Sequence, residues 1–189
     1  MLITNLIGTS THGHINRVID YVNDFSDVVC YTDYATNSNA AEYAYEMGVS
    51  AVKITRKMPQ MRFVYEIAWE HVCRAGASEN DWILSVTTDE LLHGIGDLKS
   101  ILSYEPLPIL IPICGLYDNI KNMIKSVYEP RLFPFRYGGA AFWQETIWPD
   151  YVSVMTRRRR RMHDNLILQI TSIDTINEYE GFECDFYAQ

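Results

Sequence analysis

The stretch DWILSVTTDE, residues 81–90, decides the fold. It holds the strongest strand candidate in the chain, because Trp82, Ile83, Leu84 and Val86 are large and apolar. Strands of this kind are typical of parallel sheets that are covered by helices. In an open parallel sheet, ligands bind beyond the carboxyl ends of the strands. The polar end of the stretch, residues 87–90, is therefore a candidate binding site.

Two hydroxyls and two carboxylates end this strand, at Thr87, Thr88, Asp89 and Glu90. Adjacent hard oxygen ligands suit a Mg²⁺ or Mn²⁺ ion that bridges a diphosphate. An acidic turn that starts the next loop explains the same residues. The four residues taken alone do not decide between these two interpretations.

Strand and helix patterns alternate through the first 115 residues. Apolar runs predict strands over 2–7, 28–31, 49–55, 82–86 and 107–114. Helical spacing predicts helices over 15–25, 40–47, 61–75 and 98–102. This order indicates an α/β fold with a mostly parallel central sheet flanked by helices on both faces.

The pattern changes after Gly115. Strand-like segments rich in aromatics and proline cover 127–136, 140–148 and 151–155. Strands at such close intervals indicate antiparallel additions in the C-terminal half. We expect one domain over residues 1–189, with a nucleotide-binding half over 1–115 and a modified half over 116–189.

Composition excludes several classes of protein. The 189 residues are 48% hydrophobic and 21% charged, which is typical of globular domains and not of disordered chains. No apolar run reaches the roughly 20 residues of a membrane span, and the first residues do not resemble a secretory signal. Four scattered cysteines without a CxxC pair predict reduced thiols. We therefore expect a cytoplasmic protein.

The net charge of −8 argues against general attraction to nucleic acid. Five consecutive arginines, residues 157–161, stand out from this average. A solvated basic strip that faces the acidic tail explains them. A contact with polyphosphate or nucleic acid is the functional alternative.

A second polar segment covers residues 28–39, VVCYTDYATNSN. Asp33 ends its strand, and its carboxylate can accept a hydrogen bond from a nucleobase N–H or a ribose hydroxyl. Ser38 and Asn39 are explained as caps of the following helix. Asp33 is less easily explained in that way.

Together, the two segments resemble glycosyltransferase family 2, which has the GT-A nucleotide-sugar-binding fold. The family has a strand that ends in Asp, here Asp33, followed by a helix that ends in Gly, here Gly48. Its second mark is a Trp-Ile-Leu strand leading to Asp-x-Asp-Glu, and here Thr87 replaces the first Asp. The resemblance covers about residues 1–150 and implies a divalent-metal-assisted transferase, with Mn²⁺ or Mg²⁺ and a nucleotide-diphosphate sugar as donor.

The resemblance also implies roles for individual residues. Those expected to bind the donor are Asp33, Thr9, Arg62, Thr87 and Asp89. Those expected to bind the metal are Asp89, Glu90 and His163. Glu145 is the first candidate, and Asp150 the second, for the carboxylate that removes the proton of the acceptor hydroxyl.

The leading hypothesis is a glycosyltransferase whose acceptor is a glycan, a protein, a lipid or a small molecule. One alternative is a GT-A-like protein that binds a nucleotide or glycan without turnover, which Thr87 and the short chain favour. A further alternative is a sugar transferase that acts on modified nucleic acid, with the arginine run on phosphate.

Overall fold

A computed structural model of the chain describes residues 1–8, 15–34, 39–55, 61–88, 90–93, 102, 109–116, 123–137, 160–161 and 166–169. The first half alternates strictly: β1 Leu2–Gly8, α1 Ile15–Phe25, β2 Val28–Asp33, α2 Ala40–Glu46, β3 Ser50–Lys53, α3 Met61–Arg74 and β4 Trp82–Thr87. The second half adds β5 Glu90–His93, β6 Ile109–Leu116, β7 Met123–Pro134, a short 3-10 turn at Phe135–Tyr137, β8 Arg160–Arg161 and β9 Leu166–Gln169.

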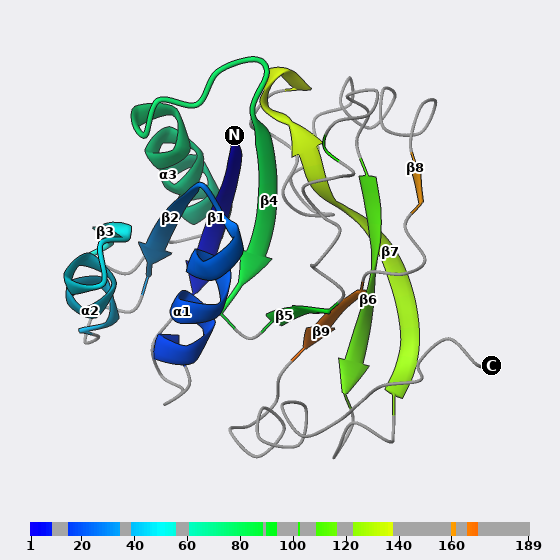
Figure 1. Ribbon diagram of the computed structural model, residues 1–189. Helices are drawn as coiled ribbons and strands as arrows, with labels where there is room; N and C mark the ends of the chain where they lie inside the picture. Colours follow the sequence, from blue (N-terminus) through cyan, green and yellow to red (C-terminus); the bar gives the residue numbers. More distant parts are fainter. Residues whose placement is uncertain are drawn as a thin grey trace.

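All described strands belong to one sheet with the order β3-β2-β1-β4-β7-β6-β9-β5, and β8 pairs with β6 (Figure 1). The four strands β3, β2, β1 and β4 are parallel. Strand β7 runs antiparallel to both β4 and β6. This arrangement confirms the predicted α/β, GT-A-like fold with antiparallel additions in the C-terminal half.

Helices cover both faces of the parallel strands. Helix α1 buries Ile15, Val18, Ile19 and Val22, the spacing of one helix face, and packs with α2 against the side of β1 that carries Leu2 and Leu6. On the opposite side of β1, Ile7 packs against Val64 and Ala68 of α3. None of the helices among the described residues is long and apolar enough to cross a membrane.

The strand order reverses at β1. The chain passes from β1 through α1 to β2 and through α2 to β3, and α3 then carries it back to β4 on the other side of β1. The carboxyl ends of β1 and β4 therefore form the topological switch point of the sheet, which is where open α/β sheets bind ligands.

Two short strands, β5 and β9, were not predicted. Neither segment is among the predicted strands, and Glu90–His93 pairs antiparallel with Leu166–Gln169. This pairing joins segments more than 70 residues apart, so no local pattern signals it. Of the predicted helix over 98–102, only Leu102 is described, in a turn, and the predicted strands over 140–148 and 151–155 lie outside the described residues.

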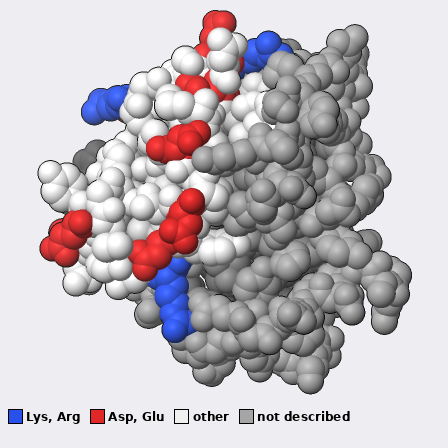
Figure 2. All heavy atoms as spheres, in the orientation of Figure 1, with Lys and Arg blue, Asp and Glu red and all other residues white. Residues whose placement is uncertain are grey.

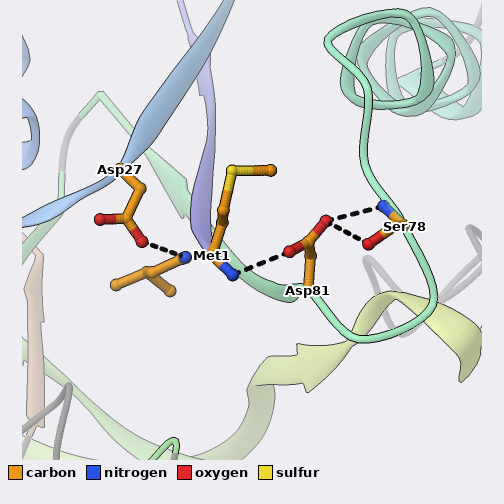
Figure 3. A network of polar contacts seen from close by, with 5 residues as sticks. Met1, Asp27, Ser78 and Asp81 are labelled. Carbon is orange, nitrogen blue, oxygen red and sulfur yellow. Dashed lines mark hydrogen bonds and ion pairs between the residues drawn. The ribbon is translucent and has the colours of Figure 1, made fainter.

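Hydrogen bonds of acidic side chains fix the end of the sheet at which the parallel strands begin (Figure 3). One oxygen of the Asp81 carboxylate accepts from the Met1 amino group at 2.8 Å, and the other accepts from the N–H and hydroxyl of Ser78. Burial raises the pKa of Asp81, but these hydrogen bonds outweigh it and lower the pKa below its ordinary value. The Asp27 carboxylate accepts from the Leu2 N–H at 2.7 Å. These two acids therefore serve the fold, at the edge opposite the switch point.

A buried histidine makes stability depend on pH. His71 of α3 is 6% exposed, and its Nε2 lies 2.8 Å from the Ser50 hydroxyl at the start of β3. Burial, and secondarily the positive charge of Arg74, lower the pKa of His71. The unfolded chain therefore takes up a proton at a pH where the folded chain keeps this ring neutral.

We expect His71 to make the folded chain less stable as the pH falls below about 6.5, the ordinary pKa of histidine. The slope from this single proton is at most about 1.4 kcal/mol per pH unit. Urea unfolding of the wild type and of His71→Gln between pH 7.5 and 5 measures it. Identical pH profiles for the two proteins would show that His71 is not the group responsible.

Candidate functional site

Three strand ends meet at the carboxyl edge of the parallel sheet. Gly8 ends β1 beside Asp33 of β2, and Ile7 lies beside Thr87 of β4. Backbone hydrogen bonds extend this contact past the strands, from the Tyr34 N–H to the Gly8 carbonyl at 3.2 Å and from the Thr88 N–H to the Ile7 carbonyl at 3.1 Å. The polar strand ends predicted from the sequence are thus brought together.

Asp33 is fully buried at the end of β2. Its carbonyl accepts from the Ile54 N–H at 2.7 Å, which holds the strand end against the residue after β3. Two residues earlier on β2, the Tyr31 hydroxyl is buried and has no hydrogen-bond partner among the described residues. Burial, and then the charges of Asp33 and Tyr34, raise the pKa of Tyr31 well above its ordinary value. The edge therefore holds a carboxylate and a neutral phenol away from water.

Gly8 and the side chain of Thr88 are in direct contact at the switch point. A Cβ added at Gly8 would overlap the side chain of Thr88 and lie 2.6 Å from its Cβ. Thr88 is itself buried, with 6% of its surface exposed. The Thr88 side chain fills the space beside Gly8.

A buried ion pair follows the strand end. Arg131 of β7 donates from Nη2 to Glu90 Oε1 at 2.8 Å and from Nη1 to Glu90 Oε2 at 3.3 Å. The Thr87 N–H donates to the same Oε2 at 2.8 Å. The side chains of Arg131 and Glu90 are 3% and 1% exposed. Both oxygens of Glu90 are therefore engaged inside the protein.

The role of Glu90 as a metal ligand stays a prediction. Its Oε2 accepts two hydrogen bonds, from Arg131 and from the Thr87 N–H, and its Oε1 accepts one from Arg131. Among the described residues, no three His, Cys, Asp or Glu side chains lie close enough to hold a metal ion. Asp89 and His163, the other predicted ligands, lie outside the described residues, so the metal site stays a prediction and we derive no step through it.

The other predicted site residues fall outside the described side chains. Thr9, Asp89, Glu145, Asp150 and His163 are not among the described residues. Arg62 lies in the first turn of α3, and its side chain is not described. Of the predicted set, the structure places Asp33 and Thr87 at the ends of the two strands that flank β1, and Glu90 within hydrogen-bond distance of the Thr87 N–H.

Sequence reasoning gave no role to Arg131. The signal was available, because Arg131 precedes Leu132 and Phe133 in a strand that pairs with the buried strand β4. An arginine in a buried strand almost always has a carboxylate partner. That partner, Glu90, is 41 positions away, so only the fold reveals it.

On the face shown in Figure 2, the charged side chains of the described residues do not gather into a basic patch. The described Lys and Arg side chains of this face stand apart from one another, with Asp and Glu side chains between them. Of the arginine run, Arg160 and Arg161 form β8 beside β6.

No protein-family model and no curated protein matches this chain. Among solved structures, it is similar to 4-diphosphocytidyl-2C-methyl-D-erythritol synthase, with a TM-score of 0.56 and 11% identity over 92% of this chain and 90% of that one. It is also similar to HddC from Yersinia pseudotuberculosis, with a TM-score of 0.54 and 6% identity over 96% and 99% of the two chains. At such identities, these likenesses show a shared fold.

A weaker likeness is to glucosyl-3-phosphoglycerate synthase from Mycobacterium tuberculosis in complex with Mn²⁺ and UDP. Its TM-score is 0.39 at 12% identity, over 61% of this chain and 44% of that one. A score at this level carries no argument about function.

Proposed function

We propose that this protein is a glycosyltransferase that takes its sugar from a nucleotide-diphosphate sugar and transfers it to an acceptor hydroxyl. The observation that carries the proposal is the meeting of Asp33, Gly8 and Thr87 at the topological switch point. The sequence resemblance to glycosyltransferase family 2 and the shared fold of the synthase named above support the same class of ligand.

In this proposal, the nucleotide lies across the ends of β1 and β2. The Asp33 carboxylate accepts from a base N–H or a ribose hydroxyl. Because Asp33 has no exposed surface in the structure, the edge must open locally for the donor to reach it. The Thr87 side chain is half-buried at the end of β4. In the proposal, its hydroxyl donates to a diphosphate oxygen.

The chemical step follows from the bonds that change. The acceptor oxygen attacks the anomeric carbon of the sugar as the bond from that carbon to the diphosphate breaks. A carboxylate takes the proton of the acceptor hydroxyl, and the nucleoside diphosphate leaves with the bonding electron pair. The sequence assigns the proton transfer to Glu145 first and to Asp150 second. The predicted metal ligands Asp89 and His163, and the cytoplasmic location, also stay predictions.

A second candidate is a protein that binds a nucleotide or a glycan without turnover. Two observations favour it. Thr87 replaces the first acid of the family's metal motif, and both oxygens of Glu90 are engaged by Arg131 and the Thr87 N–H. The nucleic-acid alternative is tested by Arg158→Ala with Arg160→Ala; unchanged weak binding to DNA and RNA excludes it.

A thermal-shift screen tests the proposed function. The purified chain is screened against UDP-, GDP-, CMP- and dTDP-sugars, each with and without Mn²⁺, and against nucleoside triphosphates. We expect one nucleotide sugar to raise the melting temperature, since a ligand that binds only the folded state stabilises it. Sugar release or transfer with that donor distinguishes the enzyme from the binding protein. No shift with any donor contradicts the glycosyltransferase and the nucleotide-binding protein, and makes a glycan the next ligand to test.

Asp33→Asn is expected to weaken binding of the nucleoside diphosphate about 10-fold or more, because a hydrogen bond to a charged group contributes roughly 1.5–3 kcal/mol. Calorimetric titration of the wild type and the variant measures the change. Asp24→Asn, at an exposed position of α1, is the matched control and should bind as the wild type does. Equal affinity in all three proteins removes Asp33 from the donor site.

A further inference from the structure

The turn after β4 is held from two sides. On one side, the Thr88 N–H is bonded to the carbonyl of Ile7 in β1. On the other side, Glu90 binds both the Thr87 N–H and the guanidinium of Arg131 in β7. Arg131 Nη1 also lies 3.4 Å from the Ser85 carbonyl of β4. The turn is thus fixed between a parallel strand of the first half and an antiparallel strand of the second.

We propose that Glu90 and Arg131 are positioning residues, which fix the backbone at Thr87, at the end of β4, and thereby set where the donor diphosphate is bound. This inference rests on the proposed function. It gives Glu90 a role beside the predicted one as a metal ligand. Glu90 acts through the hydrogen bond that it accepts from the Thr87 N–H. Arg131 acts through Glu90, because its guanidinium holds the Glu90 carboxylate in place.

The geometry favours positioning over a purely structural role. A buried ion pair is not needed for stability as such, since apolar side chains of similar size often replace one at little cost. Here one carboxylate oxygen is shared between the Arg131 guanidinium and the Thr87 N–H. The pair therefore determines the backbone conformation at the strand end where Thr87 faces the proposed donor, and an apolar pair would not.

Two double variants separate the two roles. Glu90→Met with Arg131→Met removes both charges and the acceptor together, and can retain packing. The reversed pair, Glu90→Arg with Arg131→Glu, keeps two opposite charges. It offers the Thr87 N–H no acceptor at position 90, because a guanidinium only donates. Arg131→Lys is the conservative variant, with one point charge in place of a fork that reaches two oxygens.

The first readout is hydrogen exchange at the Thr87 amide, which needs no ligand. In folded double variants, we expect exchange at least about 10-fold faster than in the wild type, because the N–H has lost its charged acceptor. Arg131→Lys should show a smaller increase. Wild-type protection in a folded double variant overturns the inference. If the apolar double variant does not fold, the reversed pair and Arg131→Lys still decide it.

The second readout is the affinity for UDP, or for whichever nucleotide shifts the wild type. The double variants should bind it about 10-fold more weakly, whereas a purely structural pair leaves affinity unchanged in a folded variant. If the wild type binds no nucleotide, the proposed function fails, and with it the link from the turn to the donor. Faster exchange at Thr87 would still show that the pair fixes the turn, so the two failures are distinguishable.

Discussion

Arg131→Met alone is expected to lower the free energy of unfolding by about 3–5 kcal/mol, the usual cost of leaving one partner of a buried ion pair uncompensated. The substitution leaves the Glu90 carboxylate, 1% exposed, without its guanidinium. Urea denaturation at pH 7 measures the loss.

Arg74→Met is the matched control. Arg74 is 76% exposed and pairs with Glu70 on the surface of α3, so its removal should change stability by less than about 1 kcal/mol. The second substitution Glu90→Met should recover most of the stability lost in Arg131→Met. Equal effects of the two arginine substitutions would contradict the description of Arg131 as a buried partner.

Gly8→Ala is expected to destabilise the chain by about 1–3 kcal/mol, the range found for an added methyl group in a packed interior. The new methyl group overlaps the buried Thr88 side chain, and the backbone at the switch point must shift to admit it. Binding of the nucleotide should weaken as well, because Gly8 lies beside Asp33.

A double-mutant cycle with Thr88→Gly identifies the cause. Removing the Thr88 side chain takes away the atoms that the new methyl group meets, so Gly8→Ala should cost less in that background. Additive losses of stability from the two substitutions would show that the Gly8–Thr88 contact is not responsible.

Local patterns of the sequence predicted the parallel half of the fold. The apolar strand Trp82–Val86 and the helical spacing of Ile15, Val18, Ile19 and Val22 are patterns that burial on a helix-covered sheet produces directly. The strand ends matched to within a few residues. What could not be predicted is the pairing of β5 with β9, because both are short and the contact between them depends on the path of the whole chain.

The candidate site was predictable to the same degree. Asp33 and Thr87 were found because a polar residue at the end of an apolar strand marks the carboxyl edge of a sheet. Glu90 was assigned by its place beside Asp89 in a motif. Its partner Arg131 comes from a distant strand, and a carboxylate paired with a buried guanidinium has the same sequence signature as one that is free to bind a metal.

The account's central claim is that a nucleotide-sugar donor lies at the carboxyl edge of β1, β2 and β4. Amide chemical-shift mapping tests it most directly, with the donor found by the thermal-shift screen titrated into ¹⁵N-labelled protein. The account predicts that the amides of Gly8, Asp33, Thr87 and Thr88 shift together and saturate with one affinity. Shifts confined to the opposite edge, around Leu2 and Trp82, would contradict it.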